Sequence, residues 1–320
     1  MEHEQAVAKC QEEEDPGGAS TASAWEAYAA MEAADEQPSR AVLVLERAES
    51  EGCCLHERIW LMHSDLLLGG LSAKGSEATL TARAVRNLPW SSELWCRRLR
   101  SLERSYEGSA EGSSESADGG AKAVGAATKA VRAAWRDALA CALASPDDYV
   151  KVLLSYCAFA RRRLAASAED AAKSKAVSDC DNSSERTIGP APPPTSKEAA
   201  KFGVDVGERA SLGEAVTVAL EGVRGAFDDA EAFVEKHYPG WDEGWLTVVR
   251  QRIQMEEFLV GKIAELGLDG SDLESQARRQ RERALRHSGK RLAAWLEAVS
   301  WERRASGDLA ACRRLFARAM

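Results

Sequence analysis

Three tryptophans, Trp25, Trp60 and Trp95, stand 35 residues apart, and this spacing constrains the fold more than any other feature. A fixed period of roughly 20 to 50 residues is typical of stacked supersecondary units. Each such unit buries one face internally and needs its neighbour to bury the other. No segment shows the sustained apolar–polar alternation that is typical of strands. We therefore predict an all-α fold, an α-solenoid built from antiparallel helix pairs.

A second marker, an Arg-Ala pair that follows apolar residues, keeps step with the tryptophans. It occurs at positions 47–48, 83–84, 283–284 and 318–319. Arg83 precedes Trp95 by 12 positions, and Arg283 precedes Trp295 by the same 12. This constant offset predicts a repeat whose first helix begins near a tryptophan and whose second helix carries the Arg-Ala pair.

The composition agrees with a folded helical chain. Of 320 residues, 45% are hydrophobic and 29% are charged, and nine tryptophans stand against six phenylalanines, as one tryptophan per repeat would require. No apolar run approaches the ~18 residues of a membrane span, so we expect no membrane contact. The eight scattered cysteines indicate reduced thiols in an intracellular compartment.

Breaks in the helical pattern divide the chain. Residues 1–20 are acidic and end in glycine and serine, so we expect disorder there. Residues 21–320 are expected to form the solenoid, interrupted by flexible inserts at about 107–120 and 166–205. Helices are expected at 22–34, 38–50, 56–68, 76–88, 92–105, 122–143, 147–165, 208–237, 241–266, 272–287, 290–305 and 308–319.

The repeat assigns packing roles to particular side chains. The tryptophan is a large apolar plate between repeats, and an aromatic or small residue three positions later shares its face. The arginine of the second helix is expected to reach the glutamate that ends the first helix, and the neighbouring alanine allows close helix approach. The residues expected to pack between repeats are Trp25, Tyr28, Glu32, Trp60, Trp95, Glu103, Tyr156, Trp295, Trp301 and Glu302.

Motifs that carry catalysis or bind cofactors do not stand out in the sequence. It has no glycine-rich phosphate loop and no Cys-x-x-Cys pair. Cys53, Cys54 and His56 lie near His63, but their spacing matches no common zinc pattern. Adjacent carboxylates, such as those at 256–257, are more often solvated helix surface than an acid–base pair. We predict no enzyme activity, no cofactor and no metal.

Charge is distributed unevenly. The net charge is −9, yet residues 276–320 contain 12 Lys/Arg and four Asp/Glu. The acidic remainder disfavours general binding to nucleic acid phosphates. The basic block is interpreted first as solvated arginines on paired helices. An acidic partner or direct contact with RNA are the alternatives.

Taken together, these phrases resemble the half-a-TPR (HAT) repeat family of RNA-processing proteins. One helix reads Trp-x-x-Tyr-x-x-x-Glu from Trp25, and Trp295 is again followed by glutamate seven positions later. Three longer phrases, 82–104, 148–163 and 295–313, are most similar to the HAT proteins that recycle spliceosomal small nuclear ribonucleoproteins. Leu153 departs from the pattern where tryptophan is expected, and His63, Arg98 and Ala298 depart where tyrosine is expected.

The resemblance implies a non-enzymatic nuclear scaffold in pre-mRNA splicing that contacts other proteins of an RNA-processing complex, with any RNA contact indirect. The alternatives are a subunit of the splicing core or of the mRNA 3′-end cleavage machinery, or a direct RNA binder through the basic block. It also implies the C-terminal half of a HAT array, which self-associates. We expect a homodimer through 272–320, with the candidate interface residues Trp295, Val299, Leu309, Leu315 and Phe316.

Overall fold

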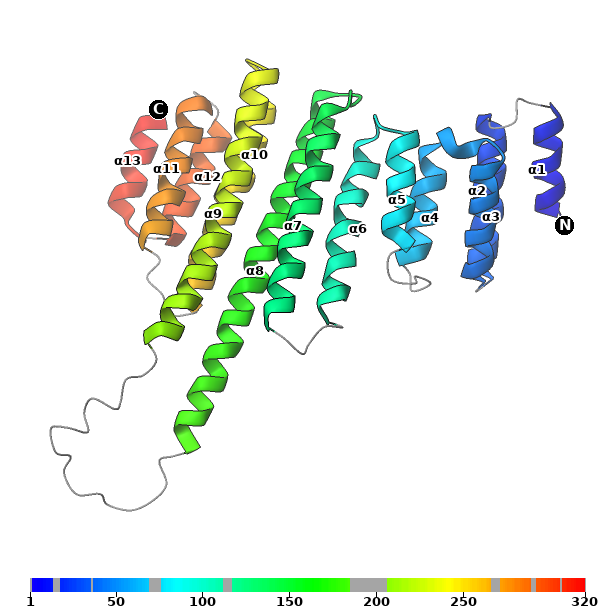
Figure 1. Ribbon diagram of the computed structural model, residues 1–320. Helices are drawn as coiled ribbons and strands as arrows, with labels where there is room; N and C mark the ends of the chain where they lie inside the picture. Colours follow the sequence, from blue (N-terminus) through cyan, green and yellow to red (C-terminus); the bar gives the residue numbers. More distant parts are fainter. Residues whose placement is uncertain are drawn as a thin grey trace. The chain divides into compact units, whose positions relative to one another are not determined.

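The protein is all-α in the part of the chain that the computed structural model describes (Figure 1). The described residues are 2–13, 18–35, 37–68, 76–111, 117–184, 206–265, 271–288, 292–305 and 307–319. Within these ranges every regular element is helical, which confirms the predicted fold class of paired helical repeats. The chain divides into two compact units, Met1–Tyr156 and Cys157–Met320. None of the described helices combines the length and apolar content needed to cross a bilayer.

The elements follow one another along the chain with short connections. They are α1 (Glu2–Glu13), α2 (Ala19–Ala34), α3 (Pro38–Ser50), the 3₁₀ turn η1 (Cys53–Leu55), α4 (Glu57–Leu66), α5 (Ser76–Asn87), α6 (Ser92–Glu111), α7 (Ala117–Ala140), α8 (Pro146–Ser184), α9 (Val206–His237), α10 (Asp242–Glu265), α11 (Ser271–Ser288), α12 (Leu292–Ala305) and α13 (Leu309–Ala319).

In the first unit, each helix packs against the next along the chain, and α2 with α3 forms the first pair (Figure 1). Helix α3 begins at Pro38, whose fixed φ suits a first helical position and whose missing N–H is not needed there. Its buried residues at 41, 44, 45 and 48 follow the helical period and face α2 and α4. Trp25, Leu45 and Ile59 are at most 1% exposed and form the centre of this packing.

In the second unit, α9 packs on α10, α10 on α11, α11 on α12 and α12 on α13. Gly240 ends the turn after α9 with φ 87°, and Gly307 separates α12 from α13 with φ 66°. Both angles lie in the left-handed region, which glycine adopts without a Cβ penalty. Leu285 and Trp295 pack together at the end of this unit, with Leu315 against them.

The turn between α7 and α8 is fixed by a buried carboxylate. Ser145 Oγ accepts from the backbone N–H of Asp148 at 3.2 Å and donates back to its Oδ2 at 2.8 Å. Ser92 Oγ, at the start of α6, donates to Asp148 Oδ1 at 2.7 Å. Burial raises the pKa of Asp148, but the hydrogen bonds from Ser92, Lys151 and Ser145 outweigh it and lower the pKa to about 2. The start of α8 is thereby tied to the start of α6.

The segment boundaries differ from the predicted ones at three places. Helix α1 covers Glu2–Glu13, where the sequence predicts disorder, and Val7 is 3% exposed because it packs with Trp25 and Ala22 of α2. Helix α6 extends to Glu111 and α7 begins at Ala117, so only 112–116 of the first predicted insert lies outside the described residues.

Helix α8 likewise continues to Ser184, well into the second predicted insert. Its extension is rich in alanine, glutamate and lysine, which favour helix without any partner, and this local preference prevails over the lack of large apolar residues. The remainder of that insert, 185–205, lies outside the described residues.

The buried tryptophans provide a direct test of the repeat frame. Trp60 is 1% exposed, so Trp60→Ala should lower the free energy of unfolding by about 3–5 kcal/mol. The matched control is Trp90→Ala, because Trp90 is 49% exposed in the turn before α6 and should cost less than about 1 kcal/mol. Thermal and urea unfolding followed by circular dichroism measure both. Equal losses in the two variants would contradict the repeat frame.

Candidate functional site

A three-residue cluster recurs wherever two consecutive helix pairs meet in both units. It consists of a glutamate on the second helix of one pair, and an arginine and a tryptophan on the second and first helices of the next pair. We name these the Glu–Arg–Trp clusters. They are Glu49, Arg83 and Trp60; Glu231, Arg283 and Trp245; and Glu282, Arg318 and Trp295.

The first cluster joins α3 to α4 and α5. The guanidinium of Arg83 lies over the Trp60 ring, with its Cζ 5.5 Å from the ring centroid, and Nη2 donates to Glu49 Oε2. The Glu49 side chain is only 3% exposed, and its other oxygen lies 2.7 Å from His63 Nδ1 of α4. One buried carboxylate thus contacts both helices of the following pair.

The second cluster repeats this arrangement between α9, α10 and α11. Arg283 Cζ lies 5.1 Å from the centroid of the Trp245 ring, and Nη1 donates to Glu231 Oε2. The other carboxylate oxygen of Glu231 accepts from Arg252 Nη1 of α10 at 2.8 Å. Arg252 occupies the role that His63 has in the first unit, so the chemistry of the second donor differs while the geometry is kept.

The third cluster joins α11 to α12 and α13 and is more open. Arg318 Cζ lies 5.4 Å from the Trp295 centroid. Its Nη1 and Nη2 donate to the two oxygens of Glu282 at 3.1 and 2.6 Å, a bidentate pair. The hydrogen bond from Arg318 is the main cause of the lowered pKa of Glu282.

The clusters set the register of neighbouring repeats for a simple electrostatic reason. A buried carboxylate without a donor is strongly destabilising, and removing one member of a buried pair typically costs about 3–5 kcal/mol. Here the donors come only from the next helix pair, so a shifted pair would leave Glu49 or Glu231 buried and unpaired. The stacking of arginine on the tryptophan face adds about 0.5–2 kcal/mol and orients the guanidinium.

Indole N–H groups add a second link between each tryptophan and the preceding turn. Trp60 Nε1 donates to the carbonyl of Cys54 at 2.8 Å, and Trp95 Nε1 donates to the carbonyl of Pro89 at 2.9 Å. Both acceptors lie six residues upstream, so the same turn geometry recurs after one period. The Trp245 indole instead donates to Glu235 Oε1 at 2.9 Å.

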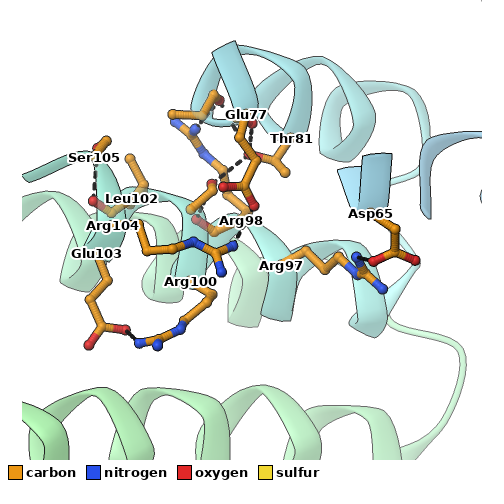
Figure 2. Close-up of polar contacts among 12 residues, drawn as sticks. Asp65, Glu77, Thr81, Arg97, Arg98, Arg100, Leu102, Glu103, Arg104 and Ser105 are labelled. Atoms are coloured by element: carbon orange, nitrogen blue, oxygen red, sulfur yellow. Dashed lines mark hydrogen bonds and ion pairs between the residues drawn. The ribbon is translucent and has the colours of Figure 1, made fainter. Parts of the chain in front are cut away.

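Figure 2 shows how α6 is held by polar contacts to the preceding pair. Arg97 donates to Asp65 of α4, and Arg104 pairs with Glu77 of α5 at 2.5 Å. Arg98, which stands where the repeat expects tyrosine, donates to the backbone carbonyl of Ala78. These arginines of α6 are therefore engaged in packing between repeats.

The same view contains a predicted packing residue, Glu103. Its side chain is 2% exposed and accepts from Arg100 of the same helix at 2.5 Å (Figure 2). Nearby, the hydroxyls of Thr81 and Ser101 lie 2.7 Å apart between α5 and α6 and are buried. Small hydroxyl side chains here allow the two helices to approach closely.

The other residues predicted to pack between repeats occupy varied environments. Trp25 and Trp95 are buried, at 1% and 6% exposure. Tyr28 and Glu32 of α2 are only half-buried, and Tyr28 stacks on Trp25 with its ring 6.3 Å away. Tyr156 is buried against Trp135 of α7, with a ring separation of 4.5 Å.

Near the C-terminus, Trp301 and Glu302 of α12 are buried at 7% and 9% exposure. Arg281 Cζ lies 4.5 Å from the Trp301 centroid, and Arg278 Nη2 donates to Glu302 at 3.4 Å. Both arginines belong to α11, so these predicted residues also contact the preceding helix.

One predicted pairing is different in the structure. The sequence predicts that the arginine of the Arg-Ala pair reaches the glutamate ending the first helix of its own pair. In the three clusters its partner is the glutamate of the preceding second helix, because the arginine lies across the tryptophan ring toward that helix. Arg47, in the first pair, stacks on Trp25 at 5.4 Å and donates to Glu51 of its own helix at 2.6 Å.

The candidate dimer residues divide into two groups. Trp295 and Leu315 pack inside the C-terminal core, and Val299 is half-buried. Leu309 and Phe316 are 61% and 47% exposed on α13. Only the exposed group is available to a partner without rearrangement.

Sequence reasoning missed Trp245 and the acceptors Glu49, Glu231 and Glu282. Trp60 and Arg83 are 23 positions apart, whereas Trp245 and Arg283 are 38 apart, so the longer connection between α10 and α11 hides this repeat from a fixed period. The available signal was a glutamate one or two positions from an Arg-Ala arginine, as at Glu49 and Glu282.

Among the described residues, no group of His, Cys, Asp and Glu is arranged to hold a metal ion. His63, which lies near Cys53 and Cys54 in sequence, is 2% exposed and bonded to Glu49. Cys53 is itself buried and free. This side-chain set therefore serves packing.

Fold and clusters together define an all-α helical-repeat protein whose polar residues connect one helix pair to the next. No family model matches the chain. The chain is similar to the protein named spliceosome associated factor 3, U4/U6 recycling protein, in several animals. The Mus musculus relative is 28% identical over 140 residues, which is 44% of this chain and 12% of the relative.

The Homo sapiens relative is 35% identical over 80 residues, 25% of this chain and 8% of the relative. The Danio rerio relative is 28% identical over 140 residues, 44% of this chain and 13% of the relative. The match thus spans a small part of these longer relatives. The predicted resemblance to a spliceosomal recycling factor is confirmed.

Proposed function

We propose that this chain is a non-enzymatic scaffold that binds proteins of the splicing machinery during the assembly or recycling of small nuclear ribonucleoproteins. The observation that carries the proposal is the similarity to U4/U6 recycling proteins. The Glu–Arg–Trp clusters support it, because they commit the buried polar side chains to holding helix pairs together. A stacked array of this kind offers an extended surface for protein partners.

Within this proposal, the chain acts in the nucleus, and its partners are proteins of an RNA-processing complex. The contacts of the basic block favour this role over direct RNA binding. Arg278 and Arg318 pair with carboxylates of neighbouring helices, at 3.4 and 2.6 Å. Arginines that are neutralised in this way release fewer counterions from a phosphate backbone, so they contribute less to RNA affinity.

Affinity capture from nuclear extract tests the proposal. The tagged chain should enrich proteins of the U4/U6 particle, and the enrichment should survive RNase treatment because the contacts are between proteins. The tag alone is the control. Enrichment of 3′-end cleavage proteins, or no enrichment of splicing proteins, would contradict the splicing role. Complete loss after RNase would favour the direct RNA binder.

We further propose that two copies associate through 272–320. The exposed apolar residues of the last two helices support this, since Leu292, Leu296, Leu309 and Phe316 are 45% to 64% exposed. Exposed large apolar side chains flanked by arginines resemble the apolar centre and charged rim of protein interfaces.

Sedimentation tests the dimer. The parent chain should sediment as a dimer at tens of micromolar, and the double variant Leu309→Asp with Phe316→Asp should be monomeric. These positions are chosen because both are exposed, so the variant should keep its fold. Leu43→Asp is the control, at a position 63% exposed in the first unit. A monomeric parent chain, or a dimer that the double variant leaves intact, would contradict the proposed interface.

A further inference from the structure

A groove of about 570 Å³ lies among α11, α12 and α13 in the second unit. Its lining combines basic, aromatic and apolar side chains, and includes Arg278, Arg281, Trp301, Asp308, Arg314 and Leu315. The groove belongs to the most basic stretch of the chain, residues 276–320, within a protein of net charge −9. Its position and charge raise the question of what occupies it.

The outer arginines of the groove are only partly engaged. Arg314 is 70% exposed, and its Nη2 is 3.5 Å from Asp308 Oδ2. Arg278 is 48% exposed and lies 3.4 Å from Glu302. Both contacts are long for a charge-assisted hydrogen bond, and a guanidinium has five N–H donors. These side chains therefore have donors to offer a bound anion.

Deeper in the groove, Arg281 is a buried cation with an incomplete set of partners. Its side chain is 9% exposed, stacks on Trp301 and pairs with Glu257 through Nη2. Its Nε is buried and has no hydrogen-bond partner. Burial is the main cause that lowers the pKa of Arg281, to about 10. A buried donor without an acceptor is destabilising, and a ligand carboxylate would relieve it.

The remaining lining distinguishes a peptide from a nucleic acid. Three carboxylates, those of Glu282, Glu302 and Asp308, also line the groove and would repel a continuous phosphate backbone. Trp301 is 7% exposed and has Arg278 and Arg281 over its ring, so it offers no open face for a base to stack on. Leu315, by contrast, offers apolar surface in the groove next to the arginines.

We propose that this groove binds a short acidic segment of a partner protein, with its carboxylates on Arg281 and Arg314 and an apolar side chain against Leu315. The inference rests on the proposed scaffold function and specifies one partner chemistry for it. Charge-assisted pairs with arginine give the segment orientation, and the mixed charge of the rim selects isolated carboxylates over a dense row of phosphates.

Two adjacent arginines of α13 provide a matched test. Arg314 lines the groove, whereas its neighbour Arg313 is exposed and does not. The probe is a fluorescein-labelled peptide, Asp-Glu-Asp-Leu-Glu-Asp-Glu, titrated with the full chain and followed by fluorescence anisotropy. Arg314→Glu should weaken binding at least ~10-fold, and Arg313→Glu no more than ~2-fold, because both change the net charge equally but only one changes the groove. Circular dichroism confirms that both variants are folded.

A peptide with Asn and Gln in place of the acids should not bind the parent chain. Three results would overturn the proposal: no saturation below ~1 mM peptide, equal weakening by the two variants, or an oligouridine RNA that binds more tightly and is lost with Arg314→Glu. Peptide binding without capture of splicing proteins would retain the groove and remove the splicing role. Capture without peptide binding would remove only the groove.

Discussion

The structure depends on buried carboxylates that the next helix pair must neutralise. Glu49 and Glu231 are each about 3–4% exposed in their side chains, and each accepts from both helices of the following pair. Dehydrating a carboxylate is expensive unless donors replace the lost water. Because these donors lie on another repeat, the interaction converts a sequence of separate helix pairs into a stack with one register. The tryptophan beneath each arginine fixes where that donor lies.

This constraint also indicates which side chains remain for partners. The tryptophans, glutamates and arginines of the clusters are occupied, so recognition falls to residues that the packing leaves exposed, such as Trp90 and Phe316. Arg281 and Arg314 differ from the cluster arginines, because their pairs leave donors over in a groove of mixed polarity. Packing and recognition in this protein thus use the same residue types, and the completeness of their pairing distinguishes the two roles.

Sequence periodicity predicts the parts of the fold that repeat at a constant interval. Trp60 and Trp95 set the frame, and the all-α class follows from it. It does not predict Trp245, because a longer connection after α10 changes the interval. It also assigns the arginine a glutamate within the same pair, since spacing along one helix pair says nothing about which neighbour lies across the tryptophan. Helix α1 is missed because Val7 gains its burial from α2, a tertiary contact that composition does not reveal.

A double-mutant cycle on Glu231 and Arg283 tests the central claim most directly. Glu231→Gln, Arg283→Gln and the double variant are compared by urea unfolding, with Glu235→Gln as a reference because Glu235 contacts the same arginine but is 57% exposed. We predict a coupling free energy of about 1–3 kcal/mol for the buried pair and less than about 1 kcal/mol for the exposed one. Additivity within about 0.5 kcal/mol for Glu231 and Arg283 would contradict the claim that this cluster holds the repeats in register.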